Sequence, residues 1–320
     1  MFTRHMRMLL AGMSSLILVS CGSSGGGSAP PVQPPPPPVD LTLPITTDNA
    51  QATTVSVLEG ITSSIELTDL TAIFGFPGIS ASNPDGLARP AADIIVQILP
   101  CDSGQVTTTW DDADNNLMLS TGDTIDADFE ACLFNDFAAT FNGLVSLSNV
   151  VVTGDLITQI GPWGFAGTMT FNMLTASDAI DTVTLNGPLG FDFNSEDNII
   201  INAEVTSLLF DVQTGTDTES LSNYVLTQVL DINSLMQTIN GSGTYTSSVL
   251  NGSVDFTTLQ DFVIIGDDNP SAGQLLISDT QSSVLVTVID NINVRLEIDT
   301  NLDGTIDSTI VVSWDELDID

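Results

Sequence analysis

The chain has 320 residues, of which 42% are hydrophobic, and it carries 41 acidic side chains against four basic ones, for a formal charge of −37. A nucleic-acid-binding protein is excluded, because contacts to phosphates require Lys and Arg. A disordered acidic tail is excluded as well, because the apolar residues are spread along the chain and suffice for the core of one large domain or two smaller ones.

The first 20 residues have the three parts of a secretory signal sequence. Arg4 and Arg7 give a basic start, an apolar stretch follows over 8–19, and residues 18–21 read Leu-Val-Ser-Cys. The apolar stretch is shorter than the roughly 20 residues that cross a bilayer, and its length suits a removable signal. We therefore predict that residues 1–20 are removed. An uncleaved anchor helix is the alternative.

Residues 18–21 resemble the lipobox of bacterial lipoproteins, in which a Leu, a variable position and a small residue precede a Cys. The resemblance implies cleavage before Cys21, a diacylglycerol on its sulfur and usually an N-linked acyl chain such as palmitate. Several chains matter, because a single one binds a membrane only marginally. Gly22 stands where inner-membrane lipoproteins often have Asp, so the resemblance predicts a lipid anchor in the outer membrane of a Gram-negative cell, on either face. An ordinary signal peptide with an incidental Cys is the alternative.

Residues 21–40 join this cysteine to the rest of the chain. Residues 22–28 are rich in Gly and Ser and predict a flexible coil, whereas 29–38 are rich in Pro and predict a stiff spacer. The segment therefore predicts a tether that holds an acidic, β-rich domain, residues 41–320, away from the membrane. Two subdomains with a break near 135–140 are compatible with this length.

Loss of residues 1–20 leaves Arg89 and Arg295 as the only basic side chains, with no Lys and no His, and a formal charge of −39. Attraction to anionic lipid headgroups is excluded, so the lipid on Cys21 must supply the membrane contact. Self-repulsion at this charge costs stability, and we expect salt or Ca²⁺ to raise it.

The lack of Lys and His also limits the chemistry. A His-based triad, a Ser–Lys pair, a Schiff base and a His-ligated zinc site are all excluded. The composition therefore favours a non-enzymatic protein. A glycan hydrolase that uses only carboxylates stays open.

Cys101 and Cys132 are the two cysteines left once Cys21 carries lipid. An even pair in an oxidising compartment predicts a disulfide, which would close a loop of about 30 residues and add on the order of 3 kcal/mol. Two free buried thiols are the alternative.

From residue 140 onward, apolar and polar residues alternate with period two, for example over 168–173, 189–194 and 294–299. This alternation, with plentiful Thr, Val and Ile, predicts strands with one buried face. We predict an all-β antiparallel meander that forms a curved sheet, a sandwich or a partial barrel, with little helix. A transmembrane barrel is disfavoured, because it needs aromatic girdles and aromatic residues are only 6%.

Local signals refine this reading. Asn-Gly is a strong hairpin signal between strands, and we expect turns at 186–187, 240–241 and 251–252. The pair at 142–143 is expected inside a strand. The segments 90–99 and 220–239 fit a helix or a strand, and 75–89 reads as a loop.

The stretch 299–307 reads Asp-Thr-Asn-Leu-Asp-Gly-Thr-Ile-Asp and matches the first nine positions of an EF-hand loop, with Gly at position six for the turn. The predicted ligands of a structural Ca²⁺ are Asp299, Asn301, Asp303, Asp307 and the carbonyl of Thr305. Position 12 is Ile310, so the usual bidentate acid is missing, and the flanks resemble strands. A solvated acidic turn is the alternative.

A second, weaker calcium loop covers 112–123. Its predicted ligands are Asp112, Asp114, Asn116, Met118, Ser120 and Asp123. Position six is Leu117 instead of Gly, which puts the sharp turn in doubt. The loop lies between the two cysteines, so their disulfide would brace it.

The arrangement of Cys101, the loop 112–123 and Cys132, with the ending 295–307 and Trp314, resembles a group of uncharacterised β-rich outer-membrane lipoproteins of Gram-negative bacteria. The resemblance implies a class of protein and no known activity.

Three hypotheses follow for function. The leading one is a membrane-anchored lipoprotein with a non-enzymatic structural or binding role towards a protein or glycan partner, with calcium as a structural ion. A carrier of a lipid or other apolar ligand in a half-barrel would need a continuous apolar concavity. A carboxylate-based glycan hydrolase would need two facing acids and stacking aromatics.

Overall fold

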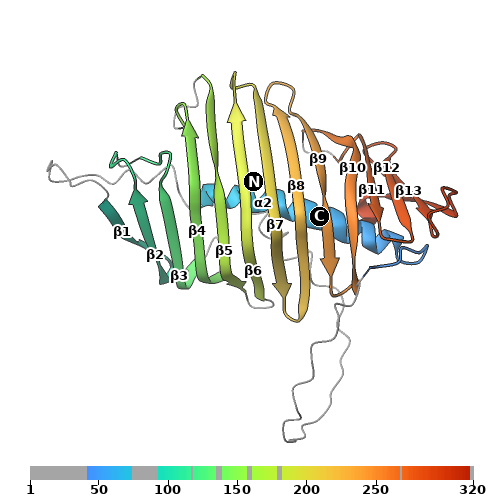
Figure 1. The fold of residues 1–320 in the computed structure, drawn as a ribbon, viewed down its shortest axis with the longest axis horizontal. Helices are drawn as coiled ribbons and strands as arrows, with labels where there is room; N and C mark the ends of the chain where they lie inside the picture. Colours follow the sequence, from blue (N-terminus) through green and yellow to red (C-terminus); the bar gives the residue numbers. More distant parts are fainter. Residues whose placement is uncertain are drawn as a thin grey trace, which may run out of the picture.

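The computed structural model describes residues 42–73, 93–116, 118–134, 139–156, 161–178, 182–266 and 269–317. These residues form an open, curved 14-stranded sheet that one long helix crosses (Figure 1). The predicted all-β meander with little helix is confirmed.

The strands follow one another across the sheet in chain order, each antiparallel to the next. The first seven are β1 (Asp93–Pro100), β2 (Ser103–Asp112), β3 (Thr124–Phe134), β4 (Ala139–Thr153), β5 (Trp163–Ser177), β6 (Thr182–Ser195) and β7 (Ile200–Thr214). The others are β8 (Asp217–Asp231), β9 (Met236–Ser247), β10 (Gly252–Ile265), β11 (Ala272–Ser278), β12 (Ser283–Val288), β13 (Asn293–Asp299) and β14 (Ser308–Ser313). Of the ambiguous segments, 93–99 lie in β1, and 220–239 hold the end of β8, a turn at 232–235 and the start of β9, whereas 75–89 lie outside the described residues.

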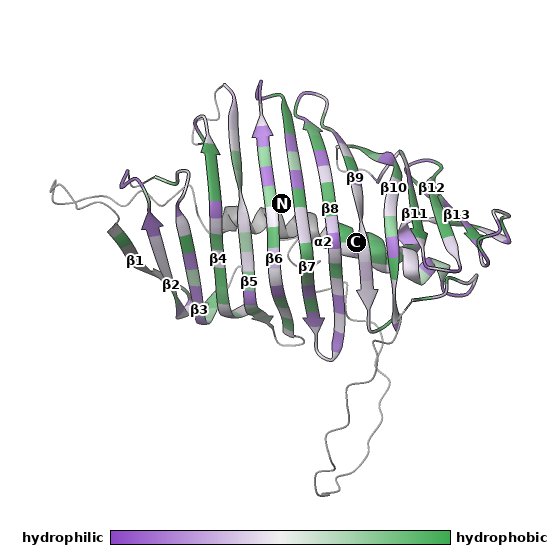
Figure 2. Ribbon diagram, viewed as in Figure 1, coloured by the Kyte–Doolittle hydropathy of each residue, from purple (hydrophilic) through white to green (hydrophobic). Residues whose placement is uncertain are grey.

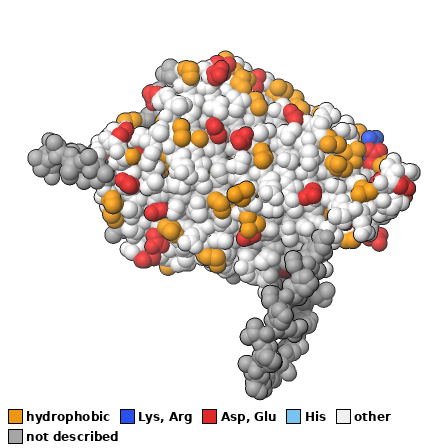
Figure 3. Space-filling model, in the orientation of Figure 1, with side chains coloured by type: hydrophobic (Ala, Val, Ile, Leu, Met, Phe, Trp, Pro, Cys, Tyr) orange, Lys and Arg blue, Asp and Glu red, His pale blue; other side chains and the backbone are white. Residues whose placement is uncertain are grey.

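One face of the sheet is buried and the other faces solvent. In β12, the side chains of Val284 and Val286 are fully buried and alternate with half-buried ones, as a period of two requires. Figure 2 shows the resulting alternation of hydrophobic and hydrophilic residues along the strands. In the view of Figure 3, acidic side chains are scattered over the face of the sheet, and basic ones are visible only toward its C-terminal end.

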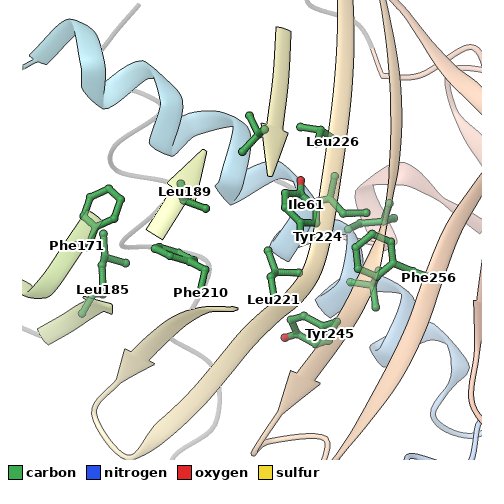
Figure 4. Close-up of a cluster of buried hydrophobic side chains, with 14 of the residues drawn as sticks. Ile61, Phe171, Leu185, Leu189, Phe210, Leu221, Tyr224, Leu226, Tyr245 and Phe256 are labelled. Atoms are coloured by element: carbon green, nitrogen blue, oxygen red, sulfur yellow. The ribbon is translucent and has the colours of Figure 1, made fainter. Parts of the chain in front are cut away.

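The helix α2 (Ala50–Ile73) covers part of the buried face. It passes behind the strands in Figure 1 and contacts β7, β9 and β13. Val57, Leu58 and Ile61 are buried, and Figure 4 shows Ile61 beside Tyr224 among the large side chains of the core. Burying a side chain of this size contributes about 1.5–3 kcal/mol, so the helix and sheet hold each other in place.

The helix was not expected from the sequence. Hydrogen bonds of the residues just before it fix the position where it starts. The Thr46 amide donates to Asn49 Oδ1 (2.7 Å) and Asn49 Nδ2 donates to the Pro44 carbonyl (2.9 Å). The Ile45 amide donates to Ser282 Oγ (2.6 Å), which ties this segment to the sheet. Among the described residues, no helix combines the length and the apolar character needed to cross a membrane.

Bulges interrupt the ladder in a row across the strands β3–β8. Ala131, Met173 and Asn223 have positive φ at such register shifts. Gly143 on β4 (φ +111°) and Gly187 on β6 (φ +115°) belong to the same row and adopt backbone angles that favour glycine. An extra residue bends a strand and increases its twist, so the row accounts for the curvature of the sheet.

The Asn-Gly pairs belong to this row more than to turns. Asn142 Oδ1 accepts the Ala131 amide (2.8 Å), and Asn186 Oδ1 accepts the Met173 amide (3.4 Å), so each asparagine satisfies a bulged backbone group next to it. The pair at 142–143 lies inside β4, as predicted. The turns predicted at 186–187 and 240–241 are wrong, because both pairs lie inside β6 and β9. Asn251, with φ +58°, does form the turn before β10.

The predicted disulfide is confirmed. Cys101 and Cys132 are bonded with their Cα atoms 5.4 Å apart, and the bond joins the turn between β1 and β2 to β3. Constraint of the unfolded chain by a loop of this length, with a sequence separation of 31 residues, adds roughly 3–4 kcal/mol in the loop-entropy account.

Candidate metal centre

Three carboxylates converge in the loop that joins β2 to β3. Ligand oxygens of Asp112, Asp114 and Asp123 all lie within 4.8 Å of one another. Asp112 ends β2, Asp123 directly precedes β3, and the hairpin brings these two ends together. Asp112 and Asp123 are fully buried, at 0% exposure, whereas Asp114 is exposed. The site thus has a buried base and an open side.

In this loop an asparagine supplies a backbone conformation that glycine usually adopts. Asn115 takes a positive φ of +59°, a conformation that Asn tolerates. The Asn116 amide donates to Asp112 Oδ1 (3.3 Å) and to Asp114 Oδ1 (3.1 Å), and Asn116 Oδ1 accepts the Met118 amide (2.6 Å). These contacts are typical of loops that present carboxylates to a cation, although acidic turns without an ion also form them. The predicted obstacle, Leu117, lies outside the described residues.

Asp123 holds the two halves of the loop together. Its carboxylate accepts hydrogen bonds from the Ala113 amide (2.9 Å), the Ser120 amide (2.9 Å), the Ser120 hydroxyl (3.2 Å) and Trp110 Nε1 (3.3 Å). Four donors occupy the roughly four lone-pair directions of a carboxylate. Asp123 therefore positions the loop, and the other two carboxylates of the group, Asp112 and Asp114, are the side chains best placed to bind an ion. The sequence pattern identified Asp123 but not its partner Trp110, for which it held no signal.

The loop is also fastened to β4. The Gly122 amide donates to the Val150 carbonyl (2.9 Å), and Thr121 Oγ1 exchanges hydrogen bonds with the backbone of Val152 (3.1 and 2.9 Å). Arg295, a described basic residue, lies on β13, toward the opposite end of the sheet from this loop, and pairs with Glu297.

The C-terminal loop makes a different arrangement. The carboxylates of Asp299, Asp303 and Asp307 do not converge as the first group does. Asp299 accepts the amides of Asn301 (3.2 Å) and Gly304 (2.9 Å). Each oxygen thus accepts a hydrogen bond from the loop's own backbone, as Asp112 and Asp114 do in the first loop, so the convergence of the carboxylates is what distinguishes the two loops.

Two further contacts complete this turn. Asn301 Oδ1 accepts the Asp303 amide (2.9 Å), and Asp303 Oδ1 accepts the Thr305 amide (2.8 Å). Asp307 turns to Thr300, whose hydroxyl and amide donate to it and hold the pKa of its carboxyl below the ordinary value. The geometry therefore reverses the order expected from sequence and favours the loop 112–123.

A second group of polar side chains lies on the buried face near α2. Burial raises the pKa of Glu219, opposed by a contact with Tyr245, and a nearby Asp217 raises it further. Burial and the Glu219 carboxyl also raise the pKa of the Tyr245 phenol, which lies near Ser247 and Ser56 of the helix. Glu219 and Tyr245 come together because the β8–β9 register sets Leu221 opposite Tyr245, and Glu219 lies two residues before Leu221 on the same face. The sequence gives no signal for that register.

Replacing Glu219 with Gln should stabilise the protein at neutral pH. The folded-state pKa lies above the ordinary 4.5, so the folded protein holds this proton more tightly than the unfolded chain does. Ionisation of Glu219 therefore lowers the stability of the fold. The loss is absent below pH 4.5, grows as the pH rises above it, and is complete above the folded-state pKa. The melting temperature of Glu219→Gln should exceed that of the native chain at pH 7 and equal it in acid. The exposed Glu204→Gln should show no such difference, and equal melting temperatures at pH 7 would contradict the prediction.

The tryptophans do not form a stacking surface. Trp110, Trp163 and Trp314 are each at most 8% exposed. A glycan hydrolase commonly needs an accessible aromatic face beside its acids, and the tryptophans of this chain do not supply one.

The comparisons with known proteins give no relative. No protein family matches the chain, and neither a curated protein nor a solved structure matches it.

Proposed function

We propose that the chain is a lipoprotein of the Gram-negative outer membrane, anchored through lipid on Cys21, whose sheet domain has a non-enzymatic structural or binding role and takes up Ca²⁺ as a structural ion. The observation that carries the calcium part is the convergence of Asp112 and Asp114 with Asp123, which holds the loop in place, within 4.8 Å. Oxygen-only ligands suit Ca²⁺, and the ion would lower the charge of a chain that carries −39 after removal of its first 20 residues.

The two alternative functions receive less support. Large side chains such as Phe171, Tyr224 and Phe256 fill the core between the described part of α2 and the sheet (Figure 4), where a carrier would need an apolar hollow. The buried tryptophans give no support to a glycan hydrolase. We therefore retain the non-enzymatic role, with a protein or glycan as its partner.

Calcium should bind residues 21–320, carrying Cys21→Ser, and stabilise them against urea. A ligand that binds only the folded state at about 100 times its Kd adds about 2.7 kcal/mol. Asp114→Asn removes the exposed carboxylate of the site and should abolish both the calorimetric heat and this stabilisation. Asp303→Asn, a matched change in the C-terminal loop, should leave both unchanged.

Two outcomes would reject this assignment. If the protein with both loops unaltered gives no heat on titration with Ca²⁺, calcium binding is rejected. Loss of binding in Asp303→Asn, with Asp114→Asn unaffected, would move the ion to residues 299–307.

The anchor is tested separately in the full chain. Cys21→Ser should move the protein from the membrane fraction to the soluble fraction, because the mature chain has almost no positive charge to hold it at a membrane. Incorporation of labelled palmitate should be lost in the same variant. Continued membrane association of Cys21→Ser would contradict lipid anchoring.

A further inference from the structure

The last strand leaves one side of the sheet unpaired. β14 is the final strand in the sheet order, and among the described residues it pairs only with β13. The Trp314 amide donates to the Ile292 carbonyl (2.9 Å), in line with the β13–β14 register. Backbone groups alternate sides along an antiparallel strand, so those of Thr309 and Val311 point away from β13. The free edge therefore presents a ladder that another strand can continue.

This edge is uncharged in a strongly acidic molecule. β14 reads Ser-Thr-Ile-Val-Val-Ser, and its β-branched residues are good strand formers. Val311 is 56% exposed. On the neighbouring strand, Arg295 pairs with Glu297 at 3.2 Å, so their charges cancel. Two such edges can approach each other with little direct repulsion.

The edge is also held rigidly in place. Val294, Leu296 and Ile298 of β13 are fully buried, and Val312 of β14 is buried on the same face. The short helix η2 (Trp314–Glu316) closes the end of the strand with a capping box between Ser313 and Glu316. A preordered strand loses little conformational entropy when it pairs.

The opposite edge is less suited to self-association. β1 also pairs with a single described strand and exposes Ile94 and Val96. However, it begins with Asp93, and its neighbour β2 carries Asp111 on the exposed side. Two β1 edges would therefore bring several carboxylates together.

We infer that the β14 edge pairs with the β14 edge of a second copy of this chain, so that two sheets join into one across a two-fold axis. An antiparallel pairing centred on Ile310 sets Thr309 of each copy opposite Val311 of the other. Within the strand no carboxylate faces another, so the edge is self-complementary, as a two-fold contact requires. This pairing is independent of the proposed calcium site and of the lipid anchor.

The ends of the seam make the pairing dependent on salt. The acidic loop 299–307 precedes β14, and Asp315 and Glu316 follow it. An antiparallel pairing brings the loop of one copy towards Asp315 and Glu316 of the other. Raising NaCl from about 0.01 M to about 1 M shortens the Debye length from about 30 Å to about 3 Å and should tighten the dimer.

Sedimentation equilibrium of residues 21–320 carrying Cys21→Ser tests the pairing. The chain should dimerise, and the dimer Kd should fall as NaCl rises. Thr309→Pro removes an amide that points away from β13 and should raise the Kd at least about tenfold, because a two-fold seam loses that hydrogen bond twice. Thr309→Val keeps the amide and the branched shape and should leave the Kd unchanged.

Two further variants decide the result. Val311→Glu lies beside Arg295 on the same face, which keeps the monomer folded, and it should weaken the dimer as Thr309→Pro does. Val96→Glu makes the same change on β1 and should have no effect. A chain that stays monomeric at every salt concentration overturns the inference, as does a dimer that Val96→Glu disrupts or one that both β14 variants leave intact.

Discussion

Replacing Asp123 with Ala should lower the free energy of unfolding by about 3–5 kcal/mol. The side chain is fully buried and accepts hydrogen bonds from Trp110, Ala113 and Ser120. Alanine leaves these donors without their acceptor, and Trp110 Nε1 among them is buried away from water. Urea unfolding in the presence of EDTA measures this loss free of any contribution from a bound metal.

Two controls separate the hydrogen bonds from the charge. Asp123→Asn keeps one acceptor oxygen and the shape of the side chain, so it should cost less than alanine. Asp303→Ala removes an exposed carboxylate from the C-terminal loop and should change stability by about 0.5 kcal/mol or less, as most surface substitutions do. A loss below 1 kcal/mol in Asp123→Ala would show that Asp123 does not organise the loop.

The alternation of side chains predicted strands in β5, β6 and β13 but not in β8, for a physical reason. In β13 the buried residues Val294, Leu296 and Ile298 keep a period of two, so sequence alone identifies the strand. In β8 both Leu221 and Tyr224 are buried although they are three residues apart, because Asn223 forms a bulge between them. A bulge moves the alternation by one residue, and no simple period survives it.

The helix α2 escaped prediction because its buried face is weakly apolar. Thr53 and Thr54 are fully buried in its first turns, beside Val57 and Ile61. The Thr54 hydroxyl donates to the Ala50 carbonyl (2.8 Å), which lets a polar residue face the sheet. Tertiary packing therefore stabilises a helix whose own sequence has many residues of modest helix propensity.

The candidate site shows what a loop pattern can and cannot predict. The EF-hand pattern identified both loops, and it ranked 299–307 first because Gly304 occupies the turn position. It could not predict that Asp307 would bind Thr300, nor that the β2–β3 hairpin would bring Asp112 and Asp123 together. The partner of an oxygen ligand depends on where the flanking strands end, and the sequence of the loop alone does not contain that information.

Gly143→Ala should cost about 3 kcal/mol or more, although it adds a single methyl group. Gly143 has a φ of +111°, which L residues rarely adopt. An ideal Cβ there would lie 2.5 Å from the Met173 carbonyl oxygen and 2.9 Å from the Leu174 Cα, so backbone of β5 would have to move. Thermal or urea unfolding measures the loss.

A matched glycine separates strain from collision. Gly215 also has a positive φ, +58°, but a Cβ there meets no atom within 4 Å. Gly215→Ala should therefore cost only the left-handed strain of about 1 kcal/mol. Gly187, whose Cβ would lie 2.5 Å from the Leu209 carbonyl oxygen, should behave like Gly143. Equal losses of stability at Gly143, Gly187 and Gly215 would show that the backbone at the row of bulges can move to accommodate a methyl group. Close backbone packing would then not be what fixes the curvature of the sheet.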